Sequence, residues 1–71
     1  MHRKSGRQIG AAIWTCLDLL YLTHHPLASL TKTVDMLRQM GWHADDVRRV
    51  EHIARKALHL PPADSPLDKA A

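Results

Sequence analysis

The strongest pattern in the chain is an apolar run at residues 9–22, IGAAIWTCLDLLYL, in which eleven of fourteen side chains are apolar. Only Gly10, Thr15 and Asp18 interrupt it. A helix that is apolar on nearly every side needs protein or membrane around it. A chain of 71 residues has few other residues with which to surround such a helix. The pattern therefore predicts that this helix contacts a second molecule.

Hydrophobic periodicity and end signals predict three helices, over residues 6–22, 27–40 and 44–60. Ser5, followed three residues later by Gln8, is a capping-box signal for the start of the first helix. Pro26 suits the start of the second helix, where its missing N–H costs nothing. Gly41 ends the second helix in a cap that brings Trp42 back against it.

The second and third helices each have one apolar stripe and one polar side. The stripes consist of Leu27, Leu30, Val34 and Leu37 in the second helix, and of Val47, Val50, Ile53, Ala54, Ala57 and Leu58 in the third. The side of the first helix expected to pack on them consists of Ile9, Ile13, Cys16, Leu17 and Leu20. The predicted fold is all-α, with a hairpin of the second and third helices packed on the first. It forms one domain over residues 1–60, and residues 61–71 follow as a flexible tail.

Length and cysteine content favour a homodimer. At this size apolar burial roughly cancels the loss of conformational entropy, so a single small core gives little net stability. One cysteine, Cys16, excludes an internal disulfide framework. Its place in the apolar run suggests a buried thiol in a reducing compartment. Oligomerisation remains as the usual way to stabilise so small a fold.

A basic start followed by an apolar run is also typical of a signal peptide, with Arg3, Lys4 and Arg7 ahead of the run. However, Asp18 lies inside the run, and no convincing cleavage site follows it. The run is also shorter than the about 20 residues that a membrane-spanning helix needs. We therefore expect a cytoplasmic protein with no membrane partner.

Four residues of the first helix are predicted as a dimer or partner interface: Gly10, Trp14, Leu17 and Tyr21. Tryptophan and tyrosine are enriched in the residues that contribute most to interfaces, and a glycine lets another backbone approach closely. The alternative is that Trp14 and Tyr21 pack over the third helix of the same chain.

The second candidate surface is a basic partner-contact face on the third helix, formed by Arg48, Arg49, His52, Arg55 and Lys56. The net charge of +3 allows an acidic protein or nucleic acid as partner without requiring either. A solvated helix face with no partner often has the same composition. Acidic residues in the same helix partly neutralise the face, which argues against strong non-specific DNA binding.

The second and third helices also resemble a helix-turn-helix, with Gly41 in the turn. In that arrangement, the side chains that point like those of a recognition helix are Arg48, Arg49 and His52. Two features depart from the motif. Leu37 stands where close helix crossing favours a small residue, and Asp45 and Asp46 open the helix that phosphates would approach.

The sequence contains no catalytic, cofactor or metal signature. His52 and His59 are about 10 Å apart by helical rise, so they cannot share one ion within a chain. Cys16 has no histidine at helical spacing to activate it. We therefore expect a protein that is not an enzyme and has no cofactor.

In size and composition the chain resembles short accessory proteins of bacterial phages and mobile elements. That resemblance implies a small regulatory protein that binds and inhibits a bacterial host protein, such as a transcription regulator. It covers no specific residues and assigns no site. The alternative function is a helix-turn-helix DNA-binding transcriptional regulator.

Overall fold

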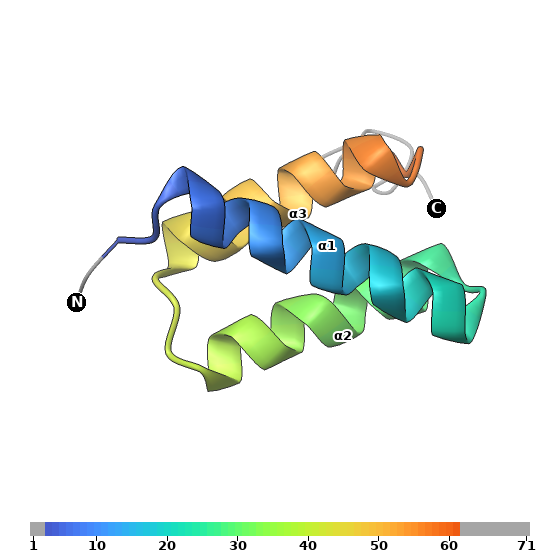
Figure 1. Ribbon diagram of the computed structural model, residues 1–71, viewed down its shortest axis with the longest axis horizontal. Helices are drawn as coiled ribbons and strands as arrows, with labels where there is room; N and C mark the ends of the chain where they lie inside the picture. The colour runs from blue at the N-terminus through green and yellow to red at the C-terminus, as the bar shows by residue number, and fades with distance from the viewer. Residues whose placement is uncertain (1–2, 62–71) are drawn as a thin grey trace, which may run out of the picture.

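A computed structural model describes residues 3–61, which form three α-helices. α1 spans Gly6–Thr23, α2 spans Pro26–Gln39 and α3 spans Ala44–Ala57, and each helix packs on the other two (Figure 1). Residues 3–61 contain no strand. The all-α class and the packing of three helices are confirmed. The predicted flexible tail, apart from its first residue, lies outside the described residues.

The start of α1 is fixed by the predicted capping box. The backbone N–H of Gln8 donates to the Ser5 hydroxyl at 3.3 Å, and the Ser5 N–H donates to the Gln8 side chain at 2.9 Å. The helix ends one residue later than predicted, at Thr23. There His24 adopts a left-handed conformation with φ 55° and donates its N–H to the Leu20 carbonyl at 2.7 Å.

The connection between α2 and α3 is the Schellman turn expected at Gly41, whose φ is +85°. Trp42 donates its N–H to the Leu37 carbonyl at 3.1 Å, and Gly41 donates to Arg38 at 3.0 Å. This pair of bonds defines the motif. The Trp42 side chain packs against the core, so the predicted return of this residue onto the fold is confirmed.

The predicted end of the third helix at residue 60 is wrong, because α3 ends at Ala57. A second Schellman motif follows it, with His59 in the left-handed region at φ 58°. Leu60 donates its N–H to the Arg55 carbonyl at 2.8 Å, and His59 donates to Lys56 at 3.2 Å. Glycine is the usual sequence signal for such a cap, and a histidine at this position gives no comparable signal.

The core lies where the three helices meet. It consists of Ile9, Ala12 and Cys16 from α1, Leu30, Val34 and Leu37 from α2, and Val47, Val50 and Ala54 from α3. On α1 the buried side is rotated from the predicted one: Ala12 is buried, whereas Leu17 and Leu20 are partly exposed. Leu27 and Ile53 also belong to predicted apolar stripes, yet they are 50% and 42% exposed.

Two hydroxyl side chains of α2, Ser29 and Thr33, are fully buried in place of larger apolar residues. Ser29 Oγ donates to the Pro26 carbonyl at 2.8 Å, and Thr33 Oγ1 donates to the Ser29 carbonyl at 2.8 Å. A hydroxyl bonded to its own helix backbone enters a core at little cost. A count of apolar positions does not detect such residues.

Leu30 and Leu27 form a matched pair on α2, because they are the same residue type at 2% and 50% exposure. We expect Leu30→Ala to lower the free energy of unfolding by about 2–5 kcal/mol, through lost burial and the cavity left behind. Leu27→Ala should cost less than about 1 kcal/mol. Urea denaturation followed by circular dichroism measures both. Equal losses in the two variants would contradict this description of the core.

Candidate functional site

The side of α1 that faces away from the core carries three large apolar side chains. Trp14, Tyr21 and Leu22 are 68%, 79% and 72% exposed. The alternative in which Trp14 and Tyr21 pack over the third helix of the same chain is therefore wrong. We call this side, with the neighbouring Gly10 and Leu17, the outer face of α1.

Gly10 and Leu17 form the edge of the outer face and are partly exposed. A Cβ added at Gly10 would meet no atom within 4 Å, so packing within residues 3–61 does not require the glycine. Gly10 leaves open space beside Trp14. From Gly10 onwards, Trp14, Leu17 and Tyr21 follow at intervals of 4, 3 and 4 residues, which is the spacing of one helix stripe. The four predicted interface residues thus share one side of α1.

The basic face of α3 is partly neutralised at its start. The Arg48 and Arg49 side chains are 73% and 53% exposed. Arg48 pairs with Asp45 Oδ1, and Arg49 Nη1 lies 3.7 Å from Asp46 Oδ1. Each of these arginines therefore faces an aspartate from the first turn of its own helix. Asp45, whose side chain is 48% exposed, therefore places one carboxylate at the surface beside the two arginines, whereas Asp46 is buried.

Arg55 differs from the other residues of the basic face because its side chain is largely buried. The Arg55 side chain is only 18% exposed. Its Nε donates to Glu51 Oε2 at 3.2 Å and its Nη1 donates to the Pro61 carbonyl at 2.7 Å. These bonds hold the end of α3, so Arg55 is engaged within the fold. His52 and Lys56 are exposed.

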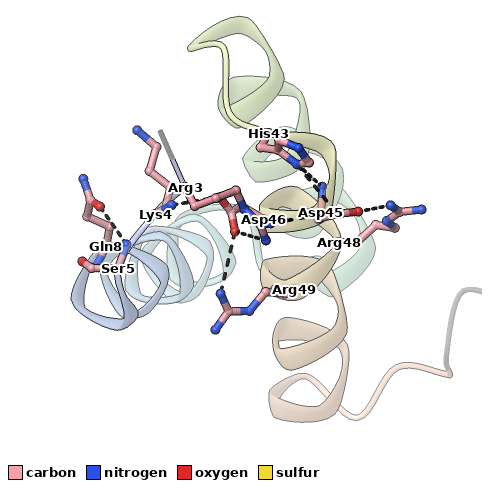
Figure 2. A network of polar contacts seen from close by, with 9 residues as sticks. All are labelled: Arg3, Lys4, Ser5, Gln8, His43, Asp45, Asp46, Arg48 and Arg49. Atoms are coloured by element: carbon pink, nitrogen blue, oxygen red, sulfur yellow. Dashed lines mark hydrogen bonds and ion pairs between the residues drawn. The ribbon is translucent and has the colours of Figure 1, made fainter. Parts of the chain in front are cut away.

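The buried carboxylate of Asp46, which no sequence pattern predicts, joins the N-terminal segment at Arg3 and Lys4 to α3 (Figure 2). The Asp46 side chain is 0% exposed. Its Oδ1 accepts from Arg3 Nη2 at 2.9 Å, and its Oδ2 accepts from the backbone N–H of Lys4 at 2.9 Å. These two bonds, helped by the charge of Arg49, lower the pKa of Asp46 to about 2, because each favours the ionised form.

The N-terminal basic segment lies against the start of α3 as a result. Arg3 Nη1 is also 3.9 Å from Asp45 Oδ2, and the bond from Arg3 to Asp46 raises the pKa of the guanidinium further above its ordinary range. Lys4 Nζ lies 5.1 Å from the centre of the Trp42 ring, which is cation–π distance. Figure 2 shows the segment reaching across to the first turn of α3. We call this segment, together with the exposed basic residues of α3, the arm–α3 surface; on α3 it consists of Arg48, Arg49, His52 and Lys56.

An open apolar groove of about 250 Å³ lies between α1 and the end of α2. Its lining includes Ala11 and Thr15 on one side and Met36, Met40 and Trp42 on the other. Met40 is 64% exposed. No single helix pattern predicts this groove, because its two walls come from different helices.

The described part of the chain carries neither a membrane-spanning helix nor a metal-binding cluster. None of its helices is both long and apolar enough to cross a membrane. Among residues 3–61, no three histidine, cysteine or acidic side chains gather closely enough to hold a metal ion. Comparisons with protein-family models, curated proteins and solved structures find no match to this chain.

The Asp46 contacts predict an acid-sensitive stability. The folded pKa of about 2 lies below the ordinary value of 3.8, so the unfolded chain takes up the proton first. The contribution of Asp46 is therefore complete above about pH 4 and is lost as the pH falls towards 2. We expect Asp46→Asn to be less stable at pH 7 and to show a shallower loss of stability between pH 4 and pH 2.

The measurement is urea denaturation at a series of pH values. Asp35→Asn, at an exposed position of α2, is the matched control and should keep the wild-type slope. Part of the slope persists in every variant, since Arg48 also lowers the pKa of Asp45. Identical slopes in the wild type and Asp46→Asn would count against the role assigned to this carboxylate.

Proposed function

We propose that this protein is a small, non-enzymatic regulatory protein that acts in the cytoplasm by binding other proteins. The observation that carries the proposal is the exposure of Trp14 and Tyr21, by 68% and 79%, on the outer face of α1. Clustered exposed apolar side chains mark interaction sites. Aromatic residues at the centre of such a surface supply much of the binding free energy.

The first proposed partner is a second copy of the chain, bound through the outer face of α1. Burial of apolar surface is worth about 25 cal/mol per Å². Covering Trp14, Tyr21 and Leu22 therefore adds stability that a single core of this size lacks. Cys16, the one cysteine, is unpaired and buried. Its burial is in keeping with a reducing compartment, in which association takes the place of disulfides.

The second proposed partner is an acidic face of a bacterial host protein, bound at the arm–α3 surface. Arg48, Arg49, His52 and Lys56 are exposed there, and the two arginines face aspartates of their own helix. Because Asp45 offsets part of the positive charge, this surface suits the discrete carboxylates of an acidic protein face better than a uniformly negative phosphate backbone. We propose a transcription regulator as the target and inhibition as the effect, in the manner of short phage or mobile-element proteins.

Trp14→Ala and Tyr21→Ala test the dimer. We expect the wild type to show about twice its chain mass of 8.0 kDa in light scattering after size exclusion. Each variant should shift towards 8.0 kDa with unchanged helical circular dichroism, because neither side chain supports the core. Ile53→Ala, at an exposed apolar position of α3, should remain dimeric. A wild-type mass of 8.0 kDa at micromolar concentration would refute the dimer.

The Arg48→Ala/Arg49→Ala double variant separates protein binding from the helix-turn-helix alternative. That alternative rests on the turn at Gly41 and on the exposure of both arginines. We expect the wild type to capture a host protein from a bacterial lysate, and the double variant to lose it while remaining dimeric. The captured protein is then purified and the difference reproduced.

Duplex DNA at low salt is the competing ligand in the same experiment. If the protein acts by binding other proteins, duplex DNA binds neither the wild type nor the double variant. Duplex binding by the wild type that falls steeply with salt and disappears in the double variant would replace the proposal with DNA recognition.

A further inference from the structure

The exposed side of α1 carries two residues of opposite charge. Arg7 and Asp18 are both exposed. Within residues 3–61 neither side chain takes part in any of the ion pairs. Arg7 also lies in the first turn of α1, which has no acidic residue. A cation there is opposed by the helix dipole.

Arg7 and Asp18 belong to one stripe with Ala11 and Trp14, which we call the Arg7–Asp18 stripe. The spacing of 4, 3 and 4 residues keeps all four on one side of the helix, over about 16 Å of its length. All four are exposed, whereas Gly10 and Leu17 on the neighbouring edge are partly covered. The stripe therefore runs along the most open side of α1.

The spacing of the four positions in the stripe, 4-3-4, is symmetric about its midpoint. Reversing the direction of the helix exchanges Arg7 with Asp18 and Ala11 with Trp14. Two copies of α1 that meet antiparallel along the stripe thus place each Arg7 opposite the other copy's Asp18. Each large Trp14 ring then lies opposite a small Ala11. The same arrangement brings Arg7 towards the carboxyl-terminal half of the other helix, on the favourable side of its dipole.

We propose that two copies of this chain associate antiparallel through the Arg7–Asp18 stripe, with two symmetric Arg7–Asp18 ion pairs flanking the two Trp14 rings. The inference rests on the proposed dimer through α1 and adds its direction and register. Charge complementarity favours a second copy as occupant, because only an antiparallel copy supplies the opposite charge at both ends of the stripe. A parallel copy would place Arg7 against Arg7 and Asp18 against Asp18.

Charge reversal tests the register. Arg7→Glu alone places two carboxylates together at both ends of the interface, and Asp18→Arg alone places two cations there. We expect each single variant to raise the dimer dissociation constant by about tenfold or more. The Arg7→Glu/Asp18→Arg double variant restores opposite charges and should return the constant to within about threefold of wild type. Sedimentation equilibrium at about 50 mM salt, where screening is modest, measures all four proteins.

We expect the charge-reversal variants to stay folded, so that a weaker dimer reflects the interface and not a loss of helical structure. An acid in the first turn suits the helix dipole better than Arg7 does, so Arg7→Glu should keep or increase helicity. Circular dichroism checks this for every variant. Arg38→Glu, a charge reversal at an exposed site on α2, is the matched control and should dimerise like the wild type.

The possible outcomes separate this inference from the proposed function. If the wild type is a dimer and single reversals leave it unchanged, or the double variant is no tighter than the singles, the antiparallel register is overturned. The dimer through the outer face then stands or falls with Trp14→Ala and Tyr21→Ala. If the wild type is a monomer, both ideas fail.

Discussion

The structure depends on a geometric constraint: in a bundle of three short helices, each helix contacts the other two along one side only. α1 buries Ile9, Ala12 and Cys16 on that side. Its sequence is apolar well beyond this arc, so Trp14 and Tyr21 face solvent by 68% and 79%. The buried apolar side chains of α2 and α3 pack on the core side of α1, so they do not cover these two aromatic residues. The fold therefore completes its core and leaves an apolar surface on the opposite side of the same helix.

Asp46 imposes a second constraint, because a buried carboxylate needs donors held in fixed positions. The donors come from Arg3 and from the backbone of Lys4, more than forty residues away in sequence. Meeting this need closes the N-terminal segment onto α3 and fixes where α1 begins relative to α3. The same contacts place the basic residues of the segment beside Arg48 and Arg49, although they are distant in the chain.

These two constraints divide the surface in a way that suits a small binding protein. A second molecule on the outer face of α1 docks opposite the side that carries α2 and α3, so it leaves the exposed part of α3 accessible. The arm–α3 surface carries paired charges of both signs, which favour selective recognition of a protein over general attraction to phosphate. Dimerisation and target binding are thus proposed for separate surfaces of one small core.

The sequence by itself determined the class of fold and the local boundaries that depend on neighbouring residues. The Ser5–Gln8 capping box, the start of α2 at Pro26 and the Schellman turn at Gly41 all follow from short-range rules. Its large exposed aromatic residues were also identifiable, because too few other residues exist to cover them. Tertiary structure alone decided the rest. It buried Ala12 instead of Leu17, admitted Ser29 and Thr33 to the core, and gave Asp46 partners from the other end of the chain. Helical periodicity fixes which residues share a side, but the exact rotation of that side and the satisfaction of a buried charge depend on which distant groups lie opposite.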